Sequence, residues 1–150
     1  MSSWVALLIE LAVILLLPYM LSAWWDHRTK KKIRNLADQC TPFTPEDFLN
    51  YRAQLPVDHD FAGVYILCNG RKHKYYVGQS IHVYHRLRQH FTGRGNPDVY
   101  ADYMRGRPFT IQVIPLEGSG FKTLNELERK AILTYDAYKH GYNKTRGNKG

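Results

Sequence analysis

Tyrosine, arginine and histidine side chains gather in one short stretch of the sequence, GVYILCNGRKHKYYVGQSIHVYHRLRQHF, residues 63–91. Two tyrosine-bearing runs flank a basic turn, and a segment rich in His and Arg follows at once. Tyrosine hydroxyls can orient water, and a guanidinium group can stabilise a negatively charged phosphate. A carboxylate such as Glu128, far along the chain, can hold a cation. This chemistry needs elements that bring the two regions together.

Local patterns predict three strands. Residues 63–68 alternate in the manner of a strand, and Asn69-Gly70 begins a turn. Residues 75–79 return as a second strand, and residues 109–116 form a third. Gly78 ends the second strand at a point where a side chain would obstruct packing or the approach of a ligand.

A helix that begins at a Ser80 cap and runs to about residue 91 is predicted next. His82, Arg86 and His90 lie four residues apart and form one stripe along it, for which a solvated polar face is the usual explanation. A metal site from His82 and His85 is a weaker reading, because the sequence offers no evident third ligand.

The last predicted helix spans about residues 123–139. Thr123 and Glu126 form a capping box, and Gly141 fits the position after the helix C-terminus. Its apolar face comprises Leu124, Leu127, Ala131, Tyr135 and Tyr138. Glu128 falls within that face, and a buried carboxylate is costly unless it is paired, hydrogen-bonded or bound to a metal. Glu128 is therefore either a structural partner of an arginine or a ligand for a cation.

Residues 4–25 form an apolar run that contains a single charged residue, Glu10. At about 1.5 Å per residue, such a helix spans a hydrocarbon core of roughly 30 Å. Trp4, Trp24 and Trp25 stand where interfacial aromatic residues belong. A cleaved signal peptide is the alternative, but no Lys or Arg precedes the run and bulky tryptophans end it.

A basic collar follows the apolar run. Residues 26–34 hold five Lys and Arg residues against one acid, which predicts that this side of the membrane is the cytoplasm. Beyond orientation, contact with anionic lipid headgroups is the favoured role of residues 28–34, and contact with nucleic acid is the alternative. The rest of residues 26–60 is expected to be a linker with one short helix, capped by Thr44 with Pro45 at its first position.

The 150 residues carry 21 Lys and Arg against 13 Asp and Glu, a net charge of +8 that suits a polyanionic partner such as nucleic acid. Cys40 and Cys68 have the spacing of neither a disulfide framework nor a zinc site.

In the chain as a whole, an ordered set of motifs resembles the GIY-YIG nuclease superfamily. The set comprises Gly63-Val64-Tyr65, Tyr76-Val77-Gly78, Arg86, His90, Glu128 and Asn143, over about residues 61–146. The resemblance implies an α+β domain with a small, mainly antiparallel three-stranded sheet flanked by helices. It also implies cleavage of DNA phosphodiester bonds with one divalent cation, Mg²⁺ or Mn²⁺.

The same resemblance assigns roles to single residues. Glu128 would hold the metal, and Tyr65 would orient or deprotonate the attacking water with help from Tyr76 or His90. Arg86 would supply positive charge beside Tyr65 and the phosphate. The supporting residues are Gly78 and Asn143.

Together these observations predict a transmembrane anchor (1–25), a collar and linker (26–60), a nuclease domain (61–146) and a short tail (147–150). The expected protein is a single-pass membrane endonuclease with its catalytic domain in the cytoplasm and DNA as its partner. The alternatives are a non-catalytic DNA-binding module tethered to the membrane and a membrane-surface interaction protein. Residues 92–108 gave no assignment, although Asn96 or Tyr100 could approach the site.

Overall fold

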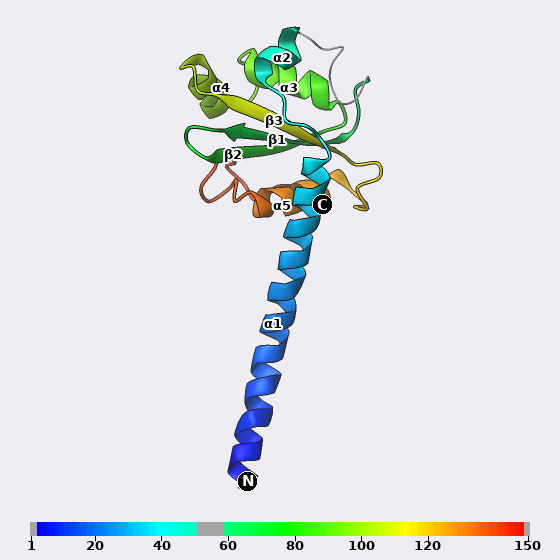
Figure 1. The fold of residues 1–150 in the computed structure, drawn as a ribbon, viewed down its shortest axis with the longest axis vertical. Helices are drawn as coiled ribbons and strands as arrows, with labels where there is room; N and C mark the ends of the chain where they lie inside the picture. The colour runs from blue at the N-terminus through cyan, green and yellow to red at the C-terminus, as the bar shows by residue number, and fades with distance from the viewer. Residues whose placement is uncertain (1–2, 51–58, 149–150) are drawn as a thin grey trace.

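An antiparallel sheet of three strands forms the centre of the α+β fold in the computed structural model, which describes residues 3–50 and 59–148 (Figure 1). The strands are β1 (Gly63–Asn69), β2 (Lys74–Ser80) and β3 (Phe109–Pro115), in the spatial order β2-β1-β3. The register places Tyr65 opposite Gly78 and Val64 opposite Gln79. The fold class and the three strands predicted from the sequence are confirmed.

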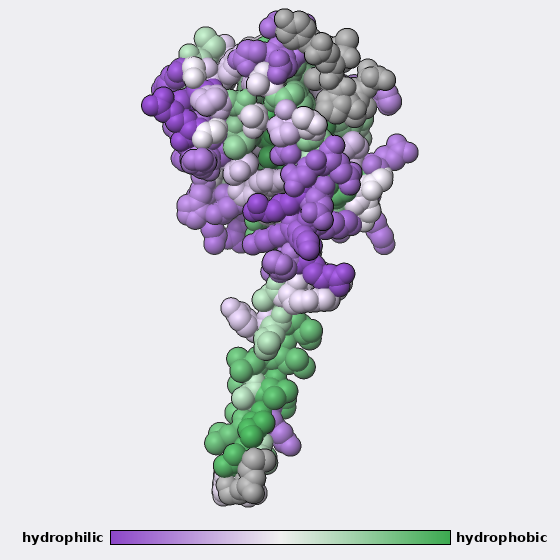
Figure 2. Space-filling view, in the orientation of Figure 1, coloured by the Kyte–Doolittle hydropathy of each residue, from purple (hydrophilic) through white to green (hydrophobic). Residues whose placement is uncertain are grey.

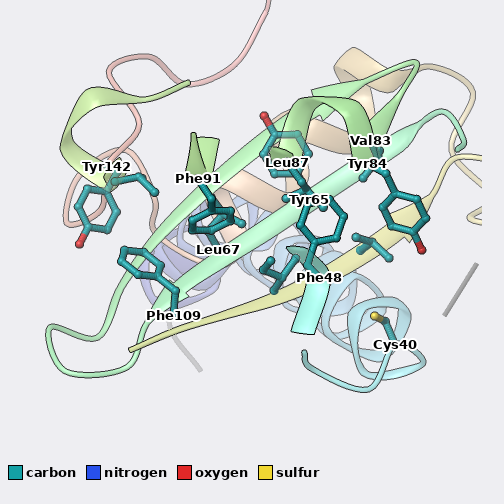
Figure 3. Close-up of a cluster of buried hydrophobic side chains, with 13 residues drawn as sticks. Cys40, Phe48, Tyr65, Leu67, Val83, Tyr84, Leu87, Phe91, Phe109 and Tyr142 are labelled. Atoms are coloured by element: carbon teal, nitrogen blue, oxygen red, sulfur yellow. The ribbon is translucent and has the colours of Figure 1, made fainter. Parts of the chain in front are cut away.

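Helices cover both faces of the sheet, so the central strand β1 is buried on both sides. One face packs against α2 (Pro45–Asn50), α3 (Val83–Phe91) and α4 (Pro97–Met104), and we call it the α3 face. Figure 3 shows its apolar cluster, in which Tyr65 lies among the buried side chains. The other face, the α5 face, packs against α5 (Leu124–Thr134) and the end of α1 (Ser3–Asp38).

The N-terminal helix α1 continues without interruption from the apolar run into the folded domain (Figure 1). Ile33 and Ala37 are fully buried against the α5 face, and Gln112 on β3 donates to the carbonyl oxygen of Ala37 at 3.0 Å. The expectation of a linker is wrong for this part of the chain, because residues 33–38 are helical and packed. Farther on, Phe43 pairs with Ile111 beside β3, and Thr44 caps α2 as predicted.

The start of α3 is capped from a distance. The side chain of Asp60 accepts hydrogen bonds from the backbone N–H groups of Tyr84 (2.8 Å) and His85 (3.1 Å). Ser80, the predicted cap, accepts only from the N–H of His82, and α3 begins at Val83. The prediction of Ser80 as the cap is therefore wrong, and Asp60 ties the entry of β1 to the helix that carries Arg86.

Two further differences concern helix ends. Thr123 caps α5 as predicted by accepting from the N–H of Glu126, but α5 ends at Thr134 and not near Lys139. Tyr138 therefore lies beyond the helix and is exposed. Gly141 is required for a different reason than predicted, since an added Cβ would clash with the carbonyl oxygen of Tyr75 on β2.

Candidate active site

A chain of hydrogen bonds runs through the α3 face from strand to loop. The Tyr65 hydroxyl lies 2.9 Å from Nε2 of His90, and both side chains are almost completely buried. The other ring nitrogen of His90, Nδ1, accepts a hydrogen bond of 3.0 Å from the backbone N–H of Asn96. Because a backbone N–H can only donate, the neutral imidazole carries its proton on Nε2 and donates it to the Tyr65 oxygen.

Burial controls the protonation of this pair. Burial, together with the smaller effect of the nearby Arg86 guanidinium, lowers the pKa of His90 to about 3, so the imidazole is neutral at physiological pH. Burial also raises the pKa of Tyr65 well above its ordinary value, and Tyr76 adds to that rise while Arg86 opposes it. The resting site therefore holds a neutral tyrosine hydroxyl that accepts one hydrogen bond from a neutral histidine.

Tyr76 and Arg86 form the accessible side of the same cluster. Both are half-buried, and the Tyr76 ring lies 4.9 Å from the His90 ring and 6.2 Å from the Tyr65 ring between centroids. Burial raises the pKa of Tyr76, Arg86 opposes the rise, and Glu128 adds to it. Tyr76 is thus the side chain on which the charges of both Arg86 and Glu128 act.

Glu128 lies on the α5 face and not among the tyrosines. Its side chain is buried, with 8% of the residue exposed, as its place on the apolar face of the helix predicts. Its Oε2 accepts from Gln79 Nε2 at 3.0 Å and from the N–H of Asn148 at 3.3 Å. Gln79 also donates to Oδ1 of Asn125 at 2.6 Å. Gln79 therefore joins a carboxylate and an amide oxygen, both from α5, to the edge strand β2.

The two supporting residues act on the edge strand itself. A Cβ on Gly78 would clash with the hydroxyl and ring of Tyr65, so only glycine lets that ring lie across β2. The Asn143 side chain pairs with the backbone of Val77, donating to its carbonyl oxygen at 2.7 Å and accepting from its N–H at 2.9 Å. Asn143 thus acts as a further strand residue that fixes β2 between the two halves of the site.

Sequence reasoning missed Gln79, Gly95 and Asn125, which complete these contacts, and it named Asn96 only as a residue that could approach the site. Gly95 and Asn96 lie in the unassigned segment, where a Cβ on Gly95 would collide with the His90 ring and where Asn96 caps α4. The Asn96-Pro97 pair is a helix-start signal that the sequence did contain. Gln79 and Asn125 left no local signal, because their role arises only when β2 meets α5.

Other candidates from the sequence lie apart from this site. His82 and His85 are exposed, and His85 shares a hydrogen bond with Gln89. Within residues 3–50 and 59–148, no three His, Cys, Asp or Glu side chains gather in a way that could hold a metal ion. Cys40 is buried and Cys68 is half-buried.

The fold is an α+β domain built on a three-stranded antiparallel sheet, and comparison with known families identifies which family it represents. The model of the GIY-YIG catalytic domain matches residues 61–143, which is more than half of the chain. The protein therefore belongs to the GIY-YIG family. Neither the curated proteins nor the solved structures gave a match.

The family implies a divalent cation, and the donor set around Glu128 fits one. Mg²⁺ keeps several water ligands in proteins and binds through one or two carboxylates together with substrate phosphates. Glu128 offers one carboxylate, and the neighbouring Asn125 offers an amide oxygen through their shared partner Gln79. A lone carboxylate of this kind suits Mg²⁺ or Mn²⁺ better than Zn²⁺, which prefers several nitrogen or sulfur ligands.

Proposed function

We propose that this protein is a membrane-anchored endonuclease that hydrolyses DNA phosphodiester bonds with one bound Mg²⁺ or Mn²⁺. The observation that supports it best is the placement of a buried carboxylate, Glu128, across the edge strand β2 from the Tyr65–His90–Arg86 cluster. Both halves meet at Tyr76, on whose pKa Arg86 and Glu128 have opposite effects.

In this proposal Tyr65 orients the attacking water. The Tyr65 oxygen accepts a hydrogen bond from His90 and keeps a second lone pair, which accepts from the water. A tyrosine is a poor base at its ordinary pKa of about 10. The neutral hydroxyl orients the water, and the water proton passes to Tyr65 only after this hydroxyl has released its own proton to solvent, as a phenolate that the His90 N–H and the Arg86 charge stabilise.

Arg86 and Tyr76 bind the scissile phosphate. They are the accessible members of the cluster, whereas Tyr65 has only 1% of its surface exposed. A guanidinium group and a tyrosine hydroxyl both donate to phosphate oxygens, and a fixed positive charge stabilises the negative charge that builds up in the transition state.

Glu128 holds the cation, with Gln79 fixing the carboxylate from β2. When bound, the cation supplies Lewis-acid polarisation of the phosphate and stabilisation of the leaving oxygen. Asn125 contributes an amide oxygen beside Glu128, and Gln79 positions both groups by donating to each of them.

The membrane part of the proposal rests on α1. Among the described residues, one helix is long and apolar enough to cross a bilayer, and it is α1. Its apolar side chains are exposed to the surroundings and form the green stalk in Figure 2. The basic residues that follow it favour a cytoplasmic location of the catalytic domain.

Cleavage by the full-length protein in detergent tests the function. The assay uses single-stranded, duplex and branched DNA with Mg²⁺, Mn²⁺ or EDTA. We expect cutting with either metal and none with EDTA. Binding of these DNAs without any cutting would contradict the proposal and favour the non-catalytic DNA-binding module.

A further inference from the structure

Basic side chains from distant parts of the chain converge around the point where α1 enters the domain. One groove of about 510 Å³ is lined by Trp25, Arg28 and Lys32 of α1 together with Phe121 and Lys130. It lies one turn past the apolar run, at the depth where lipid headgroups surround a spanning helix. The domain therefore contributes a cation, Lys130, at the same level as the collar.

A second groove lies against the same stretch of α1. It has a volume of about 580 Å³, and Lys30 lines it on the α1 side. The domain supplies its other basic residues, Arg129, Lys139 and Arg146. Its apolar residues Leu133 and Tyr138 are 53% and 40% exposed.

The acidic groups of this surface are few. Glu126 lines the first groove and Asp136 the second, against seven Lys and Arg side chains in the two grooves together. Asp136 pairs with His140. In the part of the chain that the structure describes, none of the seven cations is in an ion pair. Lys32 instead lies over the Phe121 ring, 4.2 Å from its centroid.

The position of α5 places these cations on the side of the domain from which α1 arrives. Figure 1 shows α5 beneath the sheet, on the side from which α1 arrives, and Figure 2 shows hydrophilic side chains around the base of the domain. The buried side of α5 carries Glu128 toward the sheet, so its outer side carries Arg129 and Leu133 away from it. The α3 face, with Tyr65 and His90, lies on the opposite side of the sheet.

We propose that this base surface, formed by residues 28–32 of α1 and by Arg129, Lys130, Leu133, Lys139 and Arg146, docks onto anionic phospholipid headgroups of the membrane that α1 enters. Each Lys or Arg close to an anionic membrane contributes about 1 kcal/mol of attraction, and exposed apolar side chains add burial at the interface. Docking holds the catalytic domain in one orientation, with the α3 face directed away from the bilayer. The inference rests on the anchoring part of the proposed function and not on its catalysis.

The test uses the full-length protein with Leu133→Cys carrying a bimane fluorophore, in nanodiscs of phosphatidylcholine alone or with added phosphatidylglycerol. A nitroxide on a fraction of the lipid headgroups quenches a fluorophore that lies near them. We expect quenching at least threefold stronger with phosphatidylglycerol, and we expect 0.5 M salt to remove the difference, since about 0.1 M already limits the screening length to roughly 10 Å. Cys40 is buried, and parent protein treated with the same fluorophore gives the background from Cys68.

A charge-reversed triple variant, Arg129→Glu, Lys130→Glu and Arg146→Glu, is expected to lose the phosphatidylglycerol effect. Its matched control reverses three exposed arginines away from the base, Arg71→Glu, Arg88→Glu and Arg94→Glu, and is expected to keep it. Because the comparison of the two lipids and the salt series need no variant, a triple variant that fails to fold leaves the test intact.

Equal quenching in the two lipids would overturn the docking inference while leaving the anchor in place. Protein that fails to enter nanodiscs at all would overturn both. A base variant that keeps its lipid-dependent quenching but loses DNA binding would identify the surface as a nucleic-acid contact and would also overturn the inference. DNA cleavage does not enter these readouts, so an inactive protein with lipid-dependent quenching would contradict only the catalytic proposal.

Discussion

The two faces of the sheet bury different kinds of polar side chain. On the α3 face, Tyr65 and His90 are buried as neutral groups that are hydrogen-bonded to each other. On the α5 face, Glu128 is buried, and its carboxylate accepts from the Gln79 side chain and from the backbone N–H of Asn148. A neutral pair can orient a water molecule, whereas a carboxylate can hold a cation.

The edge strand β2 lies between the Tyr65–His90 pair on the α3 face and Glu128 on the α5 face. Gly78 lets Tyr65 lie across it on one face, and Gln79 contacts Glu128 on the other. Adjacent residues of a strand point to opposite faces of a sheet. Two neighbouring positions in the sequence therefore serve two halves of one proposed site, and each half can be changed while the other stays in place.

Removing the carboxylate should have the largest effect. We expect Glu128→Gln to lower DNA cleavage on the order of 10³-fold, because a catalytic metal supplies several kcal/mol of transition-state stabilisation. Cleavage rates at saturating Mg²⁺ measure it. Glu126→Gln is the matched control, since Glu126 lies on the same helix and accepts only from the N–H of Lys122. Equal losses in the two variants would show that Glu128 has no special role.

Removing the hydroxyl on the other face should cost somewhat less. Tyr65→Phe keeps the ring and its packing, and we expect a loss of roughly 10²-fold, typical of acid–base or water-orienting groups. Single-turnover cleavage with protein in excess separates this loss from weaker DNA binding. Tyr103→Phe, in which the ring contact with Phe91 is kept, should cleave at the rate of the parent. A Tyr65→Phe variant of unchanged rate would exclude Tyr65 from the reaction.

Adding one methyl group at Gly78 should disturb the α3 face selectively. The Cβ of Gly78→Ala would clash with the Tyr65 hydroxyl, and overpacking of this kind costs about 1–3 kcal/mol of stability. A displaced Tyr65 should lower cleavage roughly 10- to 100-fold. Gly70→Ala is the control, because its added Cβ would only make ordinary contact with Pro108. Metal binding measured by calorimetry should be retained in Gly78→Ala, and its loss would mean that the two faces are not separable.

Burial of a neutral His90 should make the stability of the fold depend on pH. The pKa of His90 is lowered to about 3 in the folded protein, against about 6.5 for an exposed histidine. Between these values the unfolded chain binds a proton that the folded chain does not. The free energy of unfolding should therefore fall as the pH is lowered from about 6.5 toward 3, by up to about 1.4 kcal/mol per pH unit.

Denaturant titrations at several pH values measure this slope. His90→Asn should lower this slope by one proton. An unaltered slope in His90→Asn would contradict a buried neutral imidazole.

Most of the fold was predictable because its signals are local. Alternation predicted the strands, and Thr44 and Thr123 predicted the starts of two helices that the structure confirms. The prediction failed where a feature depends on residues that are far away in the sequence. Asp60 caps α3 across more than twenty residues, and the burial of Ile33 and Ala37 depends on α5 and the sheet.

The residues of the candidate site also differ in whether a local pattern in the sequence marks them. Glu128 was found because a carboxylate on an apolar helix face is conspicuous, and its burial bears out that reading. The remaining residues came from resemblance to a family, since a lone tyrosine in a strand carries no chemical signal. Gln79 and Gly95 were missed, and Asn96 was named only as a residue that could approach the site, because their partners, Glu128 and His90, are joined to them only by the tertiary fold.

A double-mutant cycle on Tyr65→Phe and Glu128→Gln tests most directly whether the two faces form one site. Single-turnover cleavage of the same DNA by the parent, both single variants and the double variant gives the coupling. Residues that act on one reacting phosphate are strongly non-additive. We therefore predict that the double variant cleaves within about tenfold of Glu128→Gln alone. Losses that multiply in full would contradict the account, because they would mean that Tyr65 and Glu128 act independently.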